Sequence, residues 1–365
     1  MPSPSHASPR SRRKVPADPP SPSGAVETGR IASRPLDALL ETAGLTRSPR
    51  SKSGGSVSPA RVQDKLPEEL RAAEPRTAIA ASGVQWIPVP AWQKRKWLWH
   101  GFSTRRGGVT TCYAPDGAPG ELNLTFAPHD ERENVLRNRG LFAEAITGSA
   151  ETPLVTVRQI HSSVLVVAGT SDRACKADGL ITDRPGILIG VQTADCTPVL
   201  LADRKRKVVA AFHAGWRGTV RRIVENGIGR MRLEFGSKPE DLIAAVGPGI
   251  GACCYQVGEE LLSEFESQFV YGRELFHEVY DSDPVKAKYP MLFLTRRAPG
   301  HSPIGPGLHL DVAEANRRQL LDAGLKAEAI QMVGGCTSCH GELFFSHRGS
   351  KGHAGRMLNV IGIRS

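Results

Sequence analysis

The sequence predicts an α+β fold, in which helices flank a mixed β-sheet core, over residues 86–365. Three observations support this class. Short apolar or β-branched runs, typical of strands, crowd the middle of the chain, and segments with helical periodicity occur on both sides of them. The two kinds of segment alternate irregularly, unlike the regular alternation of a doubly wound parallel sheet. The hydrophobic content of 40% is enough for a large core.

The individual elements follow from local patterns. Aromatic and apolar residues become dense near residue 84, and a loop rich in backbone amides is expected at 101–108. Apolar periodicity predicts helices at 130–146, 220–231 and 311–321, the last opening on Asp311 with Glu314 in capping-box spacing. Short runs bounded by Gly, Pro and charged residues predict strands at 154–158, 164–168, 186–191, 198–202, 208–212 and 242–246. The segment 271–306 matches no pattern and is interpreted as a lid or a plain insertion.

Residues 1–85 are predicted to be a disordered, basic tail rich in Pro and Ser. Within residues 1–60 there are 10 Pro, 12 Ser and 5 Gly. Such a composition buries too little apolar surface to offset the entropy lost on ordering. The enzyme domain is therefore expected to begin at residue 86.

The charge of the chain does not indicate a nucleic-acid partner. The formal net charge is +10, and residues 1–85, with 13 Lys/Arg and 8 Asp/Glu, account for half of it. No basic stripe interleaved with aromatic residues accompanies this charge. No apolar run reaches the length of a signal peptide or a membrane span, so we expect a cytoplasmic protein without a membrane partner.

Seven cysteines, an odd number with irregular spacing, favour reduced thiols over a disulfide framework. Cys336-Thr-Ser-Cys339-His340 spells the attachment pattern of c-type haem, but haem attachment would require export, and no export signal is seen. A structural zinc at Cys336 and Cys339 is not expected either, because a second pair with proper spacing is missing. Cys253 and Cys254 are interpreted as structural or as pocket-lining thiols.

A candidate metal site comes from three residues at predicted strand ends. His161 follows the strand at 154–158, Cys196 follows the strand at 186–191, and His213 follows the strand at 208–212. Strand ends that lead into Gly-rich loops commonly present reactive side chains. Two imidazoles and a thiolate are good zinc ligands, and three protein ligands leave a fourth position open. Spacing alone leaves a purely structural role for these residues open.

Several motifs together resemble the YfiH/laccase-domain family. They run in order from about Trp97 to Ile363, and their sequences are GFSTRRGG at 101–108, QIH at 159–161, TADCTPVLL at 193–201, HAGWRG at 213–218, GPGIGACCYQV at 247–257 and FFSHR at 344–348. The family was formerly classed as multicopper polyphenol oxidases. The resemblance implies a fold similar to that of YfiH proteins and toxin cysteine hydrolases.

The resemblance also implies an activity and a ligand set. It indicates a zinc-dependent purine nucleoside phosphorylase acting on adenosine, inosine, guanosine or methylthioadenosine and inorganic phosphate, with a side adenosine deaminase activity. Carried over by motif, the Zn²⁺ ligands are His161, Cys196 and His213. Partners are then the nucleoside and phosphate, and both a monomer and a dimer stay open.

Phosphorolysis needs a cationic cradle for phosphate, and three arginines beside glycines are candidates for it. These are Arg105, Arg106 and Arg217, the last at the predicted start of a helix, where anions bind favourably. Asn123 matches a family position and is a candidate substrate contact, with burial in the core as the alternative.

A second mechanism stays open for the same residues. Cys196 and His213 could form a thiolate–imidazole pair for nucleophilic catalysis, with Asp195 orienting the base. The protein would then be a cysteine hydrolase acting on a cell-wall precursor or a related amide. Copper oxidase chemistry is disfavoured, because multicopper sites need many more histidine ligands than three, and a thiolate with imidazoles suits zinc at least as well.

Overall fold

The computed structural model describes residues 75–169, 175–280 and 306–365. The predicted tail is therefore mostly outside the described residues, as is most of the segment 271–306. Strand pairing begins before residue 86, where the enzyme domain was expected to begin, because β1 (Ala78–Ile79) pairs with β2 (Gln85–Ile87) in an antiparallel ladder. Pairing with a neighbouring strand satisfies backbone groups that a disordered tail would leave to water.

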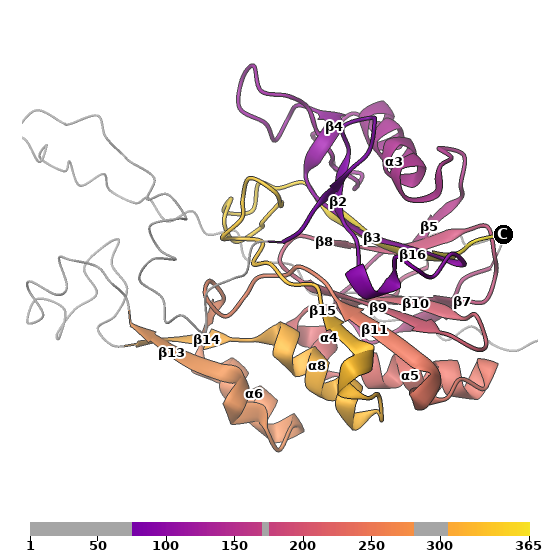
Figure 1. Ribbon diagram of the computed structural model, residues 1–365. Coiled ribbons are helices and arrows are strands. Elements are labelled where there is room, and N and C mark those ends of the chain that lie inside the picture. Colours follow the sequence, from indigo (N-terminus) through magenta and orange to yellow (C-terminus); the bar gives the residue numbers. More distant parts are fainter. Residues whose placement is uncertain (1–74, 170–174, 281–305) are drawn as a thin grey trace, which may run out of the picture. The chain divides into compact units, whose positions relative to one another are not determined.

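Two six-stranded sheets form the centre of the domain (Figure 1). In the first, the order is β1, β2, β3 (Leu98–Ser103), β16 (Met357–Ile363), β8 (Leu188–Thr193) and β5 (Leu154–Thr156). In the second, it is β15 (Ile330–Met332), β11 (Leu242–Val246), β9 (Thr197–Asp203), β10 (Val209–Ala214), β7 (Gly179–Thr182) and β6 (Leu165–Val167). Most neighbours are antiparallel, while β5–β8, β6–β7 and β11–β15 are parallel.

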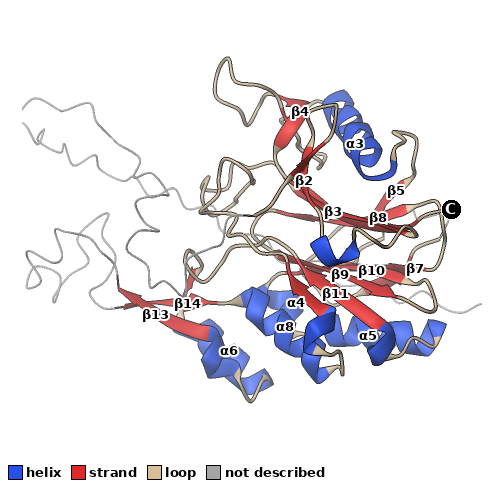
Figure 2. Ribbon diagram, viewed as in Figure 1, coloured by secondary structure: helices blue, strands red, loops and turns tan. Residues whose placement is uncertain are grey.

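The sheets pack face to face and helices cover their outer faces, which confirms the predicted α+β class (Figure 2). The largest apolar cluster lies between the sheets and includes Phe102, Val191, Leu200 and Ile361. Helix α3 (Arg132–Thr147) covers the first sheet through Phe142. Helices α4 (Trp216–Val220), α5 (Ile223–Phe235) and α8 (Val312–Asp322) cover the second.

A small third sheet stands beside these layers. It consists of β12 (Gln256–Val257), β14 (Pro306–Leu310) and β13 (Phe276–Tyr280), with β14 in the middle, and it lies next to helix α6 (Glu259–Gln268). Four short 3-10 turns complete the described chain, at Pro90–Trp92, Pro239–Asp241, Gly272–Leu275 and Ala327–Ala329.

Several predicted elements agree with the observed ones, and the differences have local reasons. The side chain of Asp311 caps α8 by accepting a hydrogen bond from the backbone N–H of Glu314 at 2.9 Å. The helix predicted at 220–231 is two helices, because Arg222 adopts a left-handed conformation (φ 57°) between α4 and α5. The loop predicted at 101–108 is wrong, since this segment belongs largely to β3 and to β4 (Arg106–Thr110).

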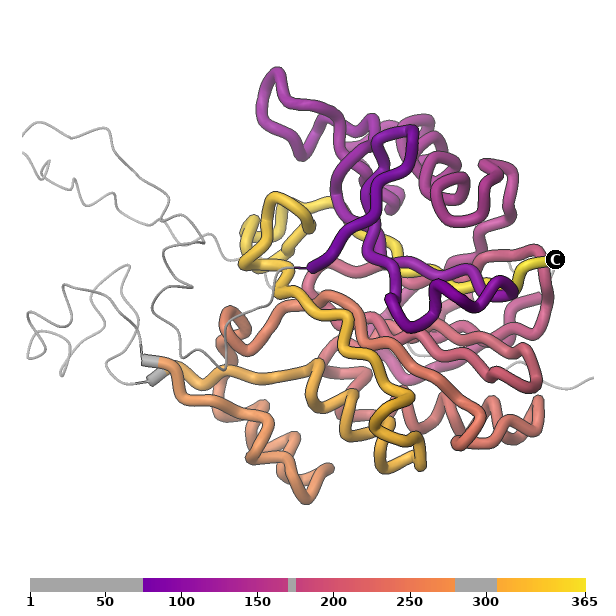
Figure 3. The backbone as a smooth tube through the Cα atoms, in the orientation of Figure 1, coloured from indigo at the N-terminus to yellow at the C-terminus, as the bar shows by residue number. Residues whose placement is uncertain are grey.

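The strand β16 joins the first sheet from a distant part of the chain. It lies between β3 and β8, and Asn359 pairs with Phe102 on one side and with Val191 on the other. Figure 3 shows this yellow segment running beside the indigo one. β16 is therefore an interior strand of the first sheet, and it is buried along its whole length.

Candidate active site and metal centre

The three predicted metal ligands meet in space. His213 is the fifth residue of β10, Cys196 lies in the tight turn between β8 and β9, and His161 follows β5. One ligand atom from each residue lies within 4.8 Å of the others, and the two imidazole rings meet edge to face with centroids 4.8 Å apart. Two imidazoles and one thiolate at this separation suit a zinc ion with one open position.

A buried carboxylate that the sequence analysis missed holds two of these ligands. Asp178 precedes β7 and is fully buried. Its carboxylate accepts hydrogen bonds from Nδ1 of His213 at 2.8 Å and from the backbone N–H of His161 at 3.0 Å. Ser162 donates to it from both its backbone N–H and its hydroxyl, each at 2.6 Å. With Nδ1 turned toward Asp178, Nε2 of His213 is the nitrogen available to a metal.

The same carboxylate stabilises an unusual backbone conformation. His161 has φ 56°, in the left-handed region that side chains other than glycine rarely adopt. The backbone N–H groups of residues 160–162 all point to Asp178, so this one carboxylate fixes the turn that presents His161. Nothing in the local sequence around Asp178 distinguishes it from an ordinary turn residue.

The electrostatics of the site favour an ionised Cys196 thiolate beside a protonated His213. Burial of the Cys196 thiol opposes ionisation, but the two imidazoles outweigh it and lower its pKa to about 6. Burial likewise disfavours a charged His213, but the Cys196 thiolate and Asp178 outweigh it and raise its pKa to about 9. Burial opposes ionisation of Asp178 as well, yet hydrogen bonds from His213 and Ser162 lower its pKa to about 2. A bound divalent cation would take the place of the proton on His213.

Gly215 leaves room for the thiolate. A Cβ atom at this position would lie 2.7 Å from Sγ of Cys196, closer than side-chain atoms normally approach. The backbone of Gly215 itself is extended (φ −66°), so the glycine is needed for space rather than for an unusual backbone angle. Gly215 of the HAGWRG motif is therefore explained by the close packing of Cys196, which comes from the turn between β8 and β9.

The three ligands open into a strongly basic pocket of about 810 Å³. The polar residues of its lining include one aspartate, Asp195, and five arginines, namely Arg139, Arg158, Arg217, Arg348 and Arg356. The guanidinium of Arg217 stacks on Trp216 at 4.3 Å, and that of Arg348 lies 5.3 Å from the ring centroid of Tyr255. Burial and, to a smaller extent, nearby Arg132 lower the pKa of Arg139 to about 10. Such a lining favours an anionic ligand.

Two glutamines also line this pocket. The side-chain amide of Gln159 donates to the carbonyl of Gln192 at 2.7 Å and accepts from its backbone N–H at 2.7 Å. The side-chain carbonyl of Gln192 accepts from the hydroxyl of Thr125. This network connects β8 with the segment that carries His161.

Other predicted site residues lie away from the pocket lining. Arg105 forms an ion pair with Glu121 at 2.7 Å and donates to the carbonyl of Gly341, and Arg106 donates to the carbonyl of Glu342. Asn123 is buried, where its amide donates to Asp130 and its carbonyl accepts from the backbone of Arg356. These contacts indicate structural roles, since the groups that would meet a substrate are used elsewhere. Of the predicted phosphate-binding arginines, only Arg217 faces the pocket.

The assignment of Asp195 as the residue that orients His213 is corrected by this geometry. Its carboxylate accepts from the hydroxyl of Thr337 at 2.7 Å and from the backbone N–H of Arg348 at 2.6 Å, and the orienting role belongs to Asp178. Asp195 also adopts a positive φ of 89°, and its carbonyl accepts from Ile250 at 2.7 Å. Asp195 thus fixes the turn that carries Cys196.

Known proteins of one family are similar to this chain. Residues 99–364 match the family described as multi-copper polyphenol oxidoreductase laccase. The chain belongs to this laccase-domain family. A purine nucleoside phosphorylase from Bacteroides thetaiotaomicron is 32% identical over 273 residues, which cover 72% of this chain and 91% of that protein. Adenosine deaminase RL5, from an unknown prokaryotic organism, is 32% identical and covers 71% of this chain and 92% of its own length.

The laccase-domain assignment extends to solved structures. The crystal structure of YlmD from Geobacillus stearothermophilus matches with a TM-score of 0.61 at 30% identity, covering 80% of this chain and all of that one. The predicted family and YfiH-type fold are therefore confirmed. In the described part of this laccase-domain chain, no helix is long and apolar enough to cross a membrane.

Proposed function

We propose that the protein is a zinc-dependent purine nucleoside phosphorylase, which uses inorganic phosphate to split a purine nucleoside into the free base and ribose 1-phosphate. The observation that carries the proposal is the position of the ligands His161, Cys196 and His213 on a pocket whose described lining holds five arginines and one aspartate. The purine nucleoside phosphorylase among the similar proteins supports the same reaction class.

The pocket suits both substrates in size and charge. Its volume of about 810 Å³ falls in the range of roughly 300–1,000 Å³ that is usual for small-molecule sites. Phosphate enters as an anion, and the pocket lining includes Arg217, which stacks on Trp216, and Arg348, which lies against Tyr255. The one acidic side chain of the lining, Asp195, has its charge compensated by the hydroxyl of Thr337 and an amide N–H. We assign phosphate binding to Arg217 and Arg348.

The chain's own residues account for binding and orientation. When bound at His161, Cys196 and His213, zinc would supply a Lewis acid with an open coordination position. Asp178 keeps Nε2 of His213 directed at the centre, and the turn held by Asp195 keeps Cys196 in place. The arginines of the pocket would hold the attacking phosphate in position. Their positive charges would stabilise the phosphate while the sugar becomes oxocarbenium-like and the base departs.

The residues favour zinc over copper oxidase chemistry. Among the described residues, two groups could hold a metal, and only one of them contains histidine. A multicopper oxidase needs several His-rich centres to gather electrons for oxygen. The name of the family therefore does not describe the chemistry that this donor set supports. A side adenosine deaminase activity fits an open metal position and the deaminase among the similar proteins.

The test is phosphate-dependent release of base. Purified protein should convert inosine to hypoxanthine only when phosphate is present, and His213→Ala should abolish the conversion and lower bound zinc. The matched control is His129→Ala, since His129 contacts Tyr113 and is not among the described residues that line the pocket. Release of hypoxanthine at the same rate without phosphate would contradict the proposal.

A cysteine hydrolase is the second candidate, and one observation favours it. Cys196, His213 and Asp178 stand in the order of nucleophile, base and orienting carboxylate, with the pKa of the thiol lowered to about 6. This reading expects stoichiometric alkylation of Cys196 by iodoacetamide in protein purified without chelators. Protection of Cys196 by one equivalent of bound zinc, lost on adding chelator, would favour the phosphorylase.

A further inference from the structure

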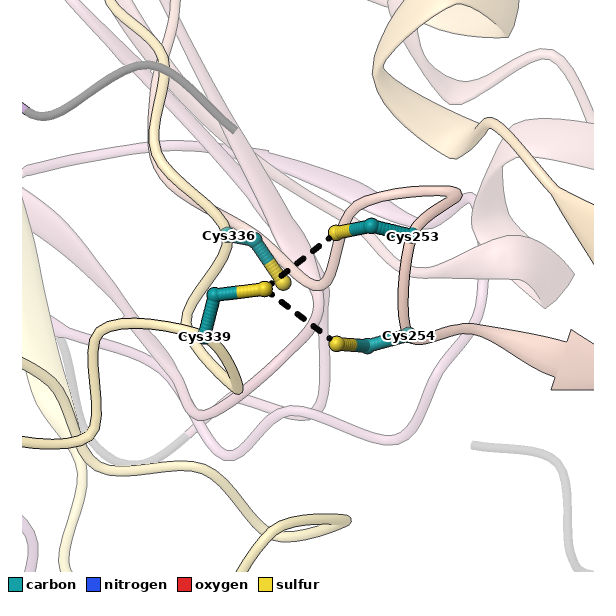
Figure 4. Close-up of side chains that lie close together, drawn as sticks. All are labelled: Cys253, Cys254, Cys336 and Cys339. Atoms are coloured by element: carbon teal, nitrogen blue, oxygen red, sulfur yellow. Dashed lines mark hydrogen bonds between the residues drawn. The ribbon is translucent and has the colours of Figure 1, made fainter. Parts of the chain in front are cut away.

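Four cysteines outside the pocket come together from two distant loops. Cys253 and Cys254 lie in the loop between β11 and β12, and Cys336 and Cys339 lie in the loop after β15. Their four Sγ atoms lie within 4.8 Å of one another. Figure 4 shows the four side chains pointing toward a common centre. Sγ of Cys339 lies 3.4 Å from those of Cys253 and Cys254.

We propose that Cys253, Cys254, Cys336 and Cys339 bind one structural zinc ion. The arrangement corrects the expectation that Cys336 and Cys339 lack a second pair, because Cys253 and Cys254, more than 80 residues earlier in the chain, supply it. The haem interpretation of 336–340 is not needed, since both thiols face the other cysteines (Figure 4).

The sulfur separations suit a single ion. Four thiolates at the usual Zn–S distance of about 2.3 Å in a tetrahedron have neighbouring sulfurs about 3.8 Å apart. Sγ of Cys339 lies 3.4 Å from those of Cys253 and Cys254, and all four sulfurs lie within 4.8 Å of one another, which is close to this value. An iron–sulfur cluster distributes its four cysteines over two or four iron atoms and so spreads their sulfurs more widely. A closed set of four protein ligands without a free position is typical of structural zinc sites.

The surroundings suit a buried metal–thiolate group. Cys253, Cys336 and Cys339 are buried and pack with Ile250 in one apolar cluster. The backbone N–H of Gly251 donates to Sγ of Cys336 at 3.3 Å, a contact that would compensate the charge of a thiolate ligand. A Cβ atom at Gly251 would lie 3.2 Å from Sγ of Cys253 and 3.3 Å from Cβ of Cys336, so glycine lets the loop approach the sulfurs closely.

The proposed ion would act on the pocket through Asp195. The loop that carries Cys253 donates from Ile250 to the carbonyl of Asp195, and the loop that carries Cys336 donates from Thr337 to its carboxylate. Thr337 also donates from its backbone to Gly249, which joins the two loops. Zinc at the four cysteines would therefore clamp both loops around the turn that presents Cys196. Its role is positioning, not contact with substrate.

The experiment measures zinc per chain and locates it. The full chain, purified without added metal and under reducing conditions, should hold two zinc ions by inductively coupled plasma mass spectrometry. The variant C336S/C339S should hold one, and His213→Ala should also hold one. The control Cys175→Ser, which removes an exposed thiol outside the cluster, should hold two.

A second measurement needs no variant and decides the matter if C336S/C339S fails to fold. Anomalous diffraction from crystals of the unaltered protein at the zinc edge should show a peak between the four sulfurs. No peak there, or a single zinc per chain that His213→Ala removes, would overturn the proposal. The remaining case is that the four cysteines form disulfides. Thiols counted after denaturation without reductant test this, and a loss of four thiols would overturn the proposal as well.

Discussion

Replacing Asp178 by Asn perturbs the centre without removing a ligand. The carboxylate accepts hydrogen bonds from His213, from three backbone N–H groups and from the hydroxyl of Ser162. Asn has nearly the same shape, but one of its two terminal groups is a donor. Whichever way the amide is turned, its NH₂ group faces either His213 Nδ1 or the N–H of Ser162. At least one charge-assisted hydrogen bond is lost and a donor meets a donor.

The expected magnitude follows from these contacts. A hydrogen bond to a charged group contributes about 1.5–3 kcal/mol, and its loss here falls on a residue that is fully buried. Loss of a partner that orients a metal-binding histidine costs roughly 10–100-fold in metal affinity, or about 1.4–2.7 kcal/mol. We therefore expect Asp178→Asn to raise the zinc dissociation constant of the His161–Cys196–His213 centre 10–100-fold.

The assay is competition for zinc with a chromophoric chelator, with the unfolding temperature measured in parallel. Asp183→Asn is the matched control, because Asp183 is exposed five positions away and loses the same charge. The same titration of His213→Ala, which retains the four cysteines, identifies the contribution of the second centre. A dissociation constant for Asp178→Asn within twofold of that for Asp183→Asn, in folded protein, would refute the assigned role of Asp178.

Three further predictions address space, phosphate and pH. Gly215→Ala should lower zinc occupancy several-fold, because the added Cβ would lie 2.7 Å from Sγ of Cys196, whereas Gly229→Ala, with nothing within 4 Å, should leave occupancy unchanged. Arg217→Ala should raise the KM for phosphate roughly tenfold or more in steady-state assays, and Arg106→Ala should not. Burial lowers the pKa of His100 to about 4, so the unfolded chain takes up a proton below its ordinary value of 6.5 while the folded chain does not. The free energy of unfolding should therefore fall between pH 6.5 and pH 4 by about 3 kcal/mol, and His100→Gln should remove this part of the decline in urea titrations.

Each of these has a contrary outcome. Full zinc occupancy in Gly215→Ala would mean that the turn carrying Cys196 moves to make room for the added methyl group. A rise in the KM for phosphate as large in Arg106→Ala as in Arg217→Ala would mean that Arg106 does bind phosphate. Parallel stability curves for His100→Gln and the unaltered protein between pH 4 and pH 6.5 would show that His100 is protonated in the folded chain.

The sequence could predict that three candidate ligands lie together because they stand in short contiguous motifs next to strands. His161, Cys196 and His213 are placed by the three strands that precede them, and the helix capped by Asp311 was also recognisable locally. Asp178 was missed because its importance comes from β7 pairing with β10, which no nearby residue indicates. Arg105 was predicted to bind phosphate because its neighbouring glycines suggested a loop, whereas the structure shows it in an ion pair with Glu121, which the sequence does not indicate.

The four-cysteine cluster illustrates the same limit more sharply. Cys336 and Cys339 alone suggested several chemistries, and the deciding partner pair is more than 80 residues away in the sequence. Spacing rules for zinc sites work when both pairs lie in one local unit. Here the pairs are brought together by β11 and β15, which lie side by side in parallel, so only the topology of the second sheet reveals the set.

The central position of β16 has a consequence for biosynthesis. The backbone N–H of Leu358 bonds to the hydroxyl of Ser103, 255 residues earlier, and until residue 363 has left the ribosome β3 and β8 lack the strand that joins them. During translation both would present open hydrogen-bonding edges, the feature by which nascent chains associate wrongly. We expect the first sheet to form only after release of this segment, and slowing of its translation to increase the dependence on chaperones.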